Sequence, residues 1–318
     1  MAHMTSVLLM LGFQAVAVGP LRCSPETTGA RGSIELMARD SRALIIATQR
    51  QLLIKDAIGT ITFDLPRPAQ EIVATDTANG VRVLIRDDGG IRLLNRGAEG
   101  ISIVWAVDGK VDAVALSRSF LVTARKRTLT AVDPSSGTPR SNQTASASVS
   151  ELRISPDEAT VAVTEGGYGL ALYDLTPEGL NRRRALYWTW DGQRRSDKAP
   201  YRSITFAPGI VAANTWDKVA VWETSTGSRR KADEATMPFS LRPIELCMGT
   251  LVLTAYGSTD SGNGLELINI SGRQLRPSGH LSRPNNPSSL RCDGDDLLFV
   301  EEGRLFRCQG PGSSKHEP

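Results

Sequence analysis

Few residues of this 318-residue chain have the types and spacing that catalysis requires. Its histidines are His3, His280 and His316, and His280 falls in a Pro- and Ser-rich stretch typical of a surface loop. A Ser-His-Asp or Cys-His arrangement would have to use that residue. The sequence contains no HExxH motif, EF-hand loop, P-loop or dinucleotide-binding glycine fingerprint. We therefore predict no catalytic residue.

Paired carboxylates are the remaining chemical candidates, because they can act as acid and base or hold a hard cation. They are Asp87-Asp88, Asp293 with Asp295-Asp296, and Glu301-Glu302, with Asp260 as a further cation ligand. The pairs fall at expected turns, where solvated carboxylates are common, and they lack a recognised ligand spacing. We predict no metal and no cofactor. A metal-dependent lyase or hydrolase using these acids stays an alternative.

The chain has four cysteines: Cys23, Cys247, Cys292 and Cys308. No two have CxxC spacing, so neither a zinc site nor a thioredoxin-like motif is indicated. So few cysteines in a long chain favour reduced, buried thiols in a cytosolic protein. A Cys292–Cys308 disulfide stays open, because both residues fall in one expected repeat unit.

An internal repeat defines the elements that must position these residues. An apolar residue, any residue, two usually apolar positions and then Asp, Asn, Glu or Gln recur at intervals of 38 to 49 residues. Such intervals are typical of four-stranded propeller blades. The seven copies are Leu52–Asp56, Ile91–Asn95, Leu129–Asp133, Leu170–Asp174, Val219–Glu223, Leu265–Asn269 and Leu305–Gln309.

Each copy follows short apolar runs and precedes a glycine. Runs such as Ile72–Ala74 and then Val81–Ile85 are typical of strands buried on both faces. The glycines suit tight turns, and they are Gly59, Gly100, Gly137, Gly179, Gly227, Gly272 and Gly312. The unit is therefore strand, strand, strand, turn, strand.

The two ends of the chain complete the count of strands. The polar tail 313–318 cannot supply the fourth strand of the seventh unit, whereas an apolar segment between Thr5 and Val18 is left over. Adding an N-terminal strand to the last blade would remove an exposed sheet edge. We predict an all-β, seven-bladed β-propeller with four-stranded antiparallel blades, closed by an N-terminal strand, over residues 5–312. Residues 1–4 are interpreted as a cloning remnant.

Two units resemble WD-repeat proteins. Leu152–Asp157, followed by Val161–Thr164 and Leu170–Asp174, is similar to a WD40 blade, as is Ser203–Pro208 with Val219–Glu223. No unit has the Gly-His pair of typical WD40 repeats, so their usual His–Asp hydrogen bond cannot form. The resemblance implies a divergent WD40-like propeller that acts as a protein-interaction scaffold.

Propellers usually bind partners on the face made by the loops between second and third strands and between blades. Here those loops carry both charge signs and three aromatic rings, which suits a peptide or protein surface. The residues are Arg50, Asp87, Lys126, Tyr168, Trp216, Tyr256 and Glu301.

The longest interval, from Asp174 to Glu223, marks an insertion within residues 181–200. This segment is rich in Trp, Tyr and Arg, the types enriched at binding hot spots. The candidate partner contacts in it are Tyr187, Trp188, Trp190, Arg194 and Arg195. Alternatively, Arg184–Trp190 is the fourth strand of the fourth unit, with its rings packed between blades.

Composition limits the partner. The 37 basic and 34 acidic residues leave a formal charge of +3, too small for an extended phosphate track, so nucleic acid is not expected. The run from Thr5 to Val18 is too short to span a bilayer, and no membrane is expected. We expect a protein or peptide partner, a monomeric propeller within a complex, and a cytoplasmic location. A small-ligand or glycan sensor using the central funnel is a further alternative.

Overall fold

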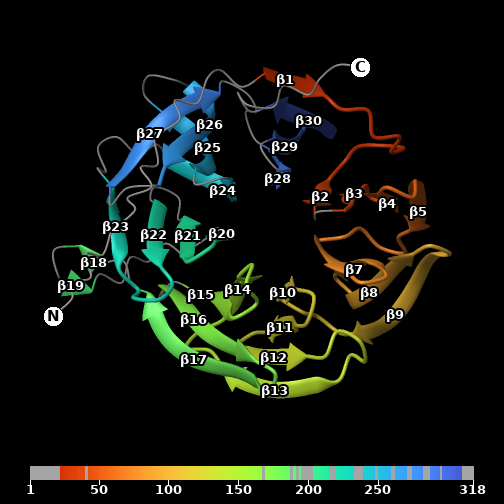
Figure 1. The fold of residues 1–318 in the computed structure, drawn as a ribbon, viewed down its shortest axis with the longest axis horizontal. Coiled ribbons are helices and arrows are strands. Elements are labelled where there is room, and N and C mark those ends of the chain that lie inside the picture. Colours follow the sequence, from red (N-terminus) through yellow and green to blue (C-terminus); the bar gives the residue numbers. More distant parts are fainter. Residues whose placement is uncertain are drawn as a thin grey trace, which may run out of the picture.

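A computed structural model shows the fold of the chain. It describes residues 22–309 except 40–41, 167–168, 187–188, 191–192, 195–202, 215–218, 233–238, 248–249, 259–261, 271–273, 282–286 and 294–295. The predicted strand between Thr5 and Val18 and the tail 313–318 lie outside the described residues. In the described part every regular element is a β-strand, and the sheets stand in a ring (Figure 1).

Four sheets in the described part are antiparallel meanders of four consecutive strands. The first two are β2 (Leu36–Arg39), β3 (Leu44–Ala47), β4 (Gln51–Lys55) and β5 (Thr60–Asp64), and β6 (Glu71–Thr77), β7 (Gly80–Asp87), β8 (Gly90–Gly97) and β9 (Gly100–Asp108). The next two are β10 (Ala113–Leu116), β11 (Leu121–Arg125), β12 (Thr128–Val132) and β13 (Pro139–Thr144), and β14 (Val149–Ile154), β15 (Thr160–Glu165), β16 (Gly169–Thr176) and β17 (Gly179–Leu186).

The next sheet has eight strands, in the order β20-β21-β22-β23-β27-β26-β25-β24. Its strands are β20 (Ser203–Ala207), β21 (Ile210–Asn214), β22 (Val219–Glu223), β23 (Arg229–Ala232), β24 (Phe239–Cys247), β25 (Thr250–Ser258), β26 (Gly262–Asn269) and β27 (Gln274–Leu281). β23 and β27 pair in parallel, with Lys231 opposite Gln274. Because this pairing joins two predicted units, the ring of described residues has six sheets, five of four strands and one of eight, and not seven separate blades.

The last sheet combines the two ends of the described chain. Its order is β1-β30-β29-β28, with β1 (Arg22–Pro25) antiparallel to β30 (Arg304–Gln309). The other two strands are β28 (Ser289–Asp293) and β29 (Asp296–Glu301). Sequence analysis did not identify β1, because the sequence Arg-Cys-Ser-Pro has no apolar pattern.

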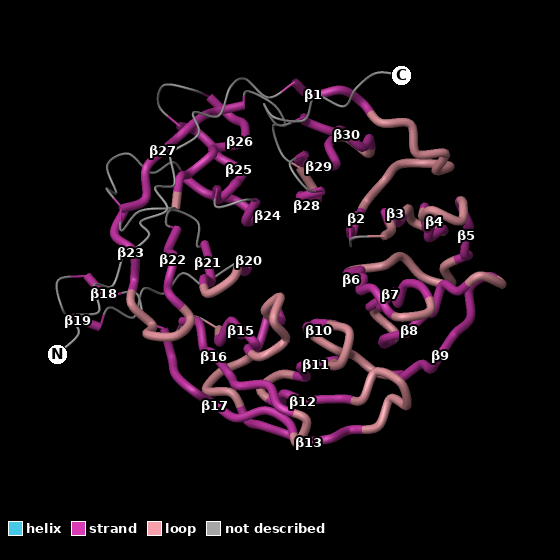
Figure 2. Tube along the Cα trace, viewed as in Figure 1, coloured by secondary structure: helices cyan, strands magenta, loops and turns pink. Residues whose placement is uncertain are grey.

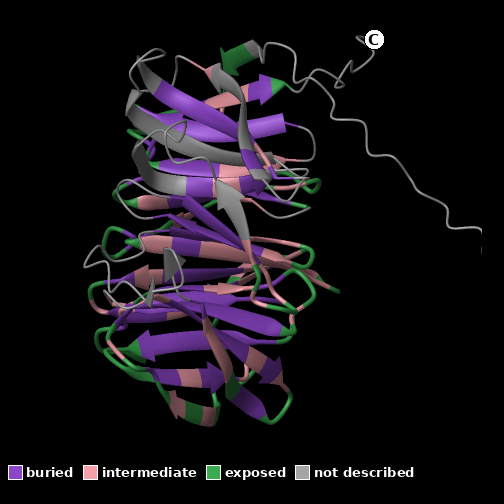
Figure 3. Cartoon of the chain, turned by 90° about the vertical axis from the view of Figure 1, so that its left-hand side faces the viewer, coloured by how far each residue is buried: buried purple, intermediate pink, exposed green. Residues whose placement is uncertain are grey.

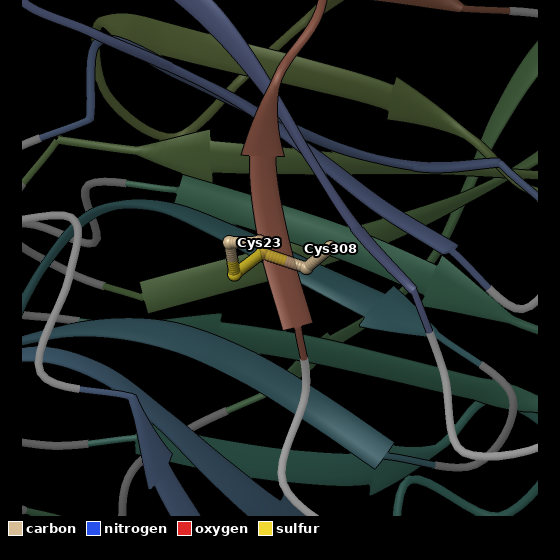
Figure 4. The surroundings of a disulfide bond; sticks show 2 residues. All are labelled: Cys23 and Cys308. Carbon is tan, nitrogen blue, oxygen red and sulfur yellow. A yellow bond between two sulfur atoms is a disulfide. The ribbon is translucent and has the colours of Figure 1, made fainter.

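A disulfide joins these two ends (Figure 4). Cys23 lies directly opposite Cys308 in the β1–β30 register, and their sulfur atoms are bonded. The expectation of reduced thiols is therefore wrong for both residues, and Cys308 cannot pair with Cys292. Cys292 is itself disulfide-bonded, and the described residues include no free cysteine.

The repeat pattern corresponds to real strands. The seven copies fall on the third strands of the units, for example Leu52–Asp56 on β4 and Val219–Glu223 on β22. Gly59 and Gly137 lie in the turn before the fourth strand with φ of +147° and +73°, a conformation in which a side chain would be strained. The strand-strand-strand-turn-strand unit is thus confirmed where the structure describes it.

The core lies between neighbouring sheets. β3, β10 and β15 are buried along their whole length, which explains their continuous apolar sequences. One cluster joins Ile45 of β3 to Val83 of β7, so side chains of adjacent sheets interdigitate. Figure 3 shows buried residues along the strands and exposed ones at the turns. In the described part of the chain, no helix could cross a membrane.

Candidate functional site

The turns between second and third strands and the connections between sheets form one hydrogen-bonded face. The connection after β5 donates from Leu65 N to the Arg50 carbonyl (2.7 Å), and Gly109 after β9 donates to Gly89 (2.8 Å). The connection after β13 donates from Ala145 N to the Arg127 carbonyl (2.8 Å). The first three sheets therefore hold this face in place, as a scaffold for binding requires.

Lys126 and Arg50 lie on this face, as predicted. Lys126 occupies the β11–β12 turn with φ of +53°, and its backbone N donates to Asp112 Oδ2 (2.6 Å). Its carbonyl accepts from Val149 N of the next sheet at 2.7 Å, and its side chain is exposed. Because the backbone is held on both sides, the side chain projects from a fixed position.

Arg50 lies at the β3–β4 turn and is exposed. It borders a cavity of about 390 Å³ that also touches Arg31 and Asp64. Gln51, another residue of this cavity, donates from Nε2 to Asp64 Oδ1 at 3.3 Å. The cavity therefore has two guanidinium groups and one carboxylate that already has a partner.

The described part of this face carries more exposed cations than carboxylates. Its exposed carboxylates are Asp64, Asp88, Asp108 and Glu302, and Asp112 is half-buried. We call its exposed cations the basic rim: Arg50, Arg67, Lys110, Arg125, Lys126 and Arg127. Both charge signs are present on this face, as predicted, although two of the predicted acids, Asp87 and Glu301, are buried.

Asp87 and Glu301 are the two predicted acids that are buried. Asp87 is 1% exposed, forms an ion pair with Arg92 and accepts from Gly89 N at 2.7 Å. Glu301 is 9% exposed at the end of β29. The expectation that Asp87 and Glu301 face a partner is wrong, because both side chains are buried. In the β7–β8 turn, the neighbouring Asp88 is exposed instead.

The predicted aromatic contacts are placed only in part. Tyr187, Trp188, Arg195, Tyr168 and Trp216 lie outside the described residues. Tyr256 lies within β25, not in a loop, and faces Phe239 across the β24–β25 register. For Tyr256, the structure describes the backbone only.

The insertion after the fourth unit forms its own hairpin. β17 ends at Leu186, so the alternative of a fourth strand over Arg184–Trp190 is wrong in its bounds. β18 (Thr189–Trp190) and β19 (Gln193–Arg194) follow, with Trp190 opposite Gln193. The backbones of Trp190 and Arg194 are thus on a hairpin separate from the blades, and a role for them in binding stays a prediction.

A second cluster, which sequence analysis missed, lies where the innermost strands meet. Figure 2 shows β6, β10, β20, β24 and β28 nearest the centre of the ring. Arg153 of β14 pairs with Glu71 of β6, two sheets away (Nη1–Oε1, 3.4 Å), and its Nη2 is 3.1 Å from Glu151. Arg291 of β28 pairs with Glu245 of β24 at 3.4 Å. The sequence signal that could have revealed this network was the presence of charged residues, such as Glu151 and Arg153, within otherwise apolar inner strands.

The network is electrostatically coupled across the centre. Burial lowers the pKa of Arg153, but Glu151, Glu71 and Glu245 more than offset this and raise it above its ordinary value. Burial raises the pKa of Glu245 and lowers that of Arg291, although each is the other's partner. Each carboxylate in this network has a guanidinium partner, so the network has the character of a structural lock more than of an acid–base pair.

The last predicted acidic cluster is also structural. Arg307 Nη1 lies 2.8 Å from both Asp293 Oδ2 and Asp296 Oδ2, and its Nε lies 2.9 Å from Glu26. Arg39 of β2 pairs with Asp293 at 2.9 Å. The described residues contain no group of three His, Cys, Asp or Glu that could hold a metal. His280, expected in a loop, lies in β27 opposite Glu266, whereas Asp260 and Asp295 lie outside the described residues.

Asp293→Asn should lower the free energy of unfolding by about 1–2 kcal/mol at pH 7, since it weakens charged hydrogen bonds. Burial alone would raise the pKa of Asp293, but Arg307 and Arg39 hold it below its ordinary value. This stability is therefore present above the unfolded-state pKa of about 3.9 and is lost as pH falls through the native pKa. Urea unfolding from pH 7 downward measures it.

The matched control is Asp88→Asn, whose exposed carboxylate lies 3.5 Å from Arg67. An exposed pair contributes about 0–1 kcal/mol, so this variant should behave like the native protein at each pH. A cost for Asp293→Asn that persists unchanged in acid would contradict an electrostatic origin.

The opposite face carries a groove between the third and fourth sheets. Its volume is about 620 Å³, and its walls include Arg118, Asp157 and Glu158. Arg140 covers the Phe120 ring at 5.6 Å and also pairs with Asp133. The Arg118 backbone N donates to Glu158 at 2.7 Å. Most charges of this groove therefore have partners within the protein. In the basic rim, Arg67 pairs with Asp88 at 3.5 Å and Lys110 with Asp112 at 3.9 Å, whereas Arg50 and Lys126 form no ion pair among the described residues.

Comparison with known proteins supports the fold alone. No protein-family model and no curated protein matches the chain. A chain in the crystal structure of the mitotic checkpoint complex is similar over 96% of this chain and 99% of that one, with a TM-score of 0.65 and 12% identity. The computationally designed Ika8 protein is similar over 89% of this chain and 97% of its own, with a TM-score of 0.58 and 12% identity. The chain has a β-propeller fold with four-stranded antiparallel blades.

Proposed function

We propose that this protein is a non-catalytic scaffold that binds another protein or peptide through its basic rim. The carrying observation is that exposed cations stand on turns whose backbones are fixed by hydrogen bonds to the connections that enter or leave the same sheet and, at Lys126, to the first strand of the next sheet. A rigid cationic surface favours a partner with an acidic segment, by electrostatic complementarity. The similarity to a chain in a protein complex is consistent with a protein partner.

The fold in this proposal is a divergent, WD40-like propeller of seven blades. The eight-stranded sheet counts as two blades, β20–β23 and β24–β27, because each half is an antiparallel meander like the other four-stranded sheets. In the sheet β1-β30-β29-β28, the N-terminal strand β1 is the fourth strand, because the C-terminal part of the chain contributes three strands. The disulfide between Cys23 and Cys308 supports closure of the ring by that strand.

An enzyme is the weaker alternative. Asp87, Asp293 and Asp296 are paired with arginines, which disfavours the acid–base chemistry considered for them. Absence of a metal or cofactor stays a prediction, and so does a cytoplasmic location. The disulfide is a reason to test that location, since cytosolic reductants keep most thiols reduced.

The test is affinity capture from a lysate of the native host with Arg50→Glu/Lys126→Glu beside the native protein. We expect the partner captured by the native protein to fall at least about tenfold in this variant, because two attractive contacts become repulsive. Raising the salt concentration should weaken capture by the native protein too. Quantitative mass spectrometry gives the readout.

The matched control is Arg118→Glu, an exposed arginine at the other end of β11, on the opposite face. It changes the charge of the protein in the same direction and should retain the partner. Equal capture by all three proteins would show that the basic rim is not the binding face. Loss of the partner with Arg118→Glu alone would place binding in the groove between the third and fourth sheets.

A further inference from the structure

The exposed apolar residues of this protein gather along one edge. Among the described residues, the exposed large hydrophobic side chains are Ile58 (63%), Ile103 (54%), Val104 (38%) and Val107 (37%). Three of them lie on β9. Ile58 is near its start, because Asp56 pairs with Arg96 at 3.2 Å and Arg96 is opposite Ile101. Such gathering on one edge marks an interaction site more often than scattered apolar residues do.

β9 is the outermost strand of its sheet, and no described strand pairs with its outer edge. Its sequence, Gly-Ile-Ser-Ile-Val-Trp-Ala-Val, has no charge and no proline from Gly100 to Val107. A strand with unpaired backbone groups and apolar side chains is a template for another strand. A β-bulge at Val104 leaves both Ile103 and Val104 exposed.

The other outermost strands are either already paired or protected against such pairing. β23 and β27 pair with each other, charged residues or proline occur on β1, β13 and β17, and β5 ends in the exposed Asp64. These are the features by which sheet proteins block edge-to-edge contact. β9 differs from all of these strands. The partner that best fits its outer edge, which no described strand covers, is a strand like β9 itself: extended, uncharged and apolar.

We propose that the outer edge of β9 pairs with β9 of a second copy of this chain. Within the described chain, β9 is the outermost strand that meets this requirement, and a two-fold pairing is self-complementary. An antiparallel register with Val104 opposite Trp105 of the second copy also brings Glu99 opposite Lys110, twice. Both side chains are exposed. A parallel arrangement would instead align like charges.

Edge-to-edge pairing of outermost strands already occurs in this molecule. β23 and β27 pair in that way and extend two meanders into one eight-stranded sheet. Two β9 strands would likewise extend two four-stranded sheets into one of eight strands across the dimer. Trp105 holds the strand in place, because its Nε1 donates to the Pro134 carbonyl of the neighbouring sheet at 3.0 Å.

Sedimentation velocity of the full chain from about 1 μM to about 200 μM tests the pairing, a range that covers weak association. We expect the native protein to shift from monomer to dimer with concentration. Ile103→Lys/Val107→Lys should raise the Kd of dimerisation at least about tenfold, since charge at an edge blocks pairing. Both residues are exposed, so an unchanged melting temperature should verify the fold.

The control is Thr62→Lys, which adds the same charge to the exposed side of the outermost strand β5 and should dimerise like the native protein. Glu99→Lys should weaken the dimer, and adding Lys110→Glu should restore it. A native protein that stays monomeric throughout, or a dimer insensitive to the β9 lysines, would overturn the proposal. A monomer would also confirm the earlier expectation of a monomeric propeller. The test of the basic rim would still stand, because it replaces Arg50 and Lys126, which the dimer test leaves unchanged.

Discussion

Replacing both Cys23 and Cys308 with serine should lower the free energy of unfolding by about 3–5 kcal/mol. The bond links residues 285 positions apart, so it removes a large loop-closure entropy from the unfolded chain. In the native state, β1 is the edge strand of its sheet and is attached there by its pairing with β30 and this bond. Guanidinium unfolding of the two proteins measures the loss.

The serine variant is preferable to chemical reduction, because reduction would also act on the disulfide of Cys292. Ser24→Ala is the control on the same strand, since its side chain is exposed, and it should change stability by less than about 0.5 kcal/mol. Limited proteolysis should cut the serine variant near residues 22–25 before the rest of the chain. Equal stability and equal protease resistance would contradict a role for the bond in holding the two ends together.

Trp222→Ala should cost about 3–5 kcal/mol, comparable to the disulfide. Trp222 is 1% exposed and packs in a cluster that includes Leu172, Leu186 and Ile204. Because these residues come from both the β14–β17 sheet and the β20–β23 strands, the cavity would open between neighbouring sheets and not inside one. Thermal and guanidinium unfolding should both show the loss.

Trp222→Phe should retain much of the stability, because a smaller ring leaves a smaller cavity. Ile58→Ala is the exposed apolar control and should change stability by less than about 0.5 kcal/mol. If Trp222→Ala also stayed within that range, the packing between these sheets would contribute little to holding the ring together.

The repeat could be read from the sequence because it depends on neighbours in the chain. A buried strand needs a short apolar run, and the turn before a fourth strand needs a backbone that glycine adopts easily. Val81–Ile85 and Gly137 could therefore be assigned without a structure. The face on which Arg50 and Lys126 lie could be predicted in the same way, because each residue lies in a turn between a second and a third strand.

Residues on that face were less predictable in their exposure. Asp87 and Asp88 are adjacent and chemically alike, yet Asp87 is buried against Arg92 and Asp88 is exposed. Which acid faces solvent depends on the position of an arginine in the next strand. Similarly, the ion pair of Arg153 with Glu71 joins positions 82 residues apart that meet only when the inner strands converge.

The amino-acid sequence by itself determined the strand-and-turn unit, its sevenfold recurrence and the lack of common catalytic motifs, because these are local patterns. Only the tertiary structure decided that β23 pairs with β27, that Cys23 faces Cys308 and that no described strand covers the apolar outer edge of β9. Each of these depends on which strands become neighbours across long stretches of chain. That choice is made by the packing of whole sheets, not by the residues that flank a strand.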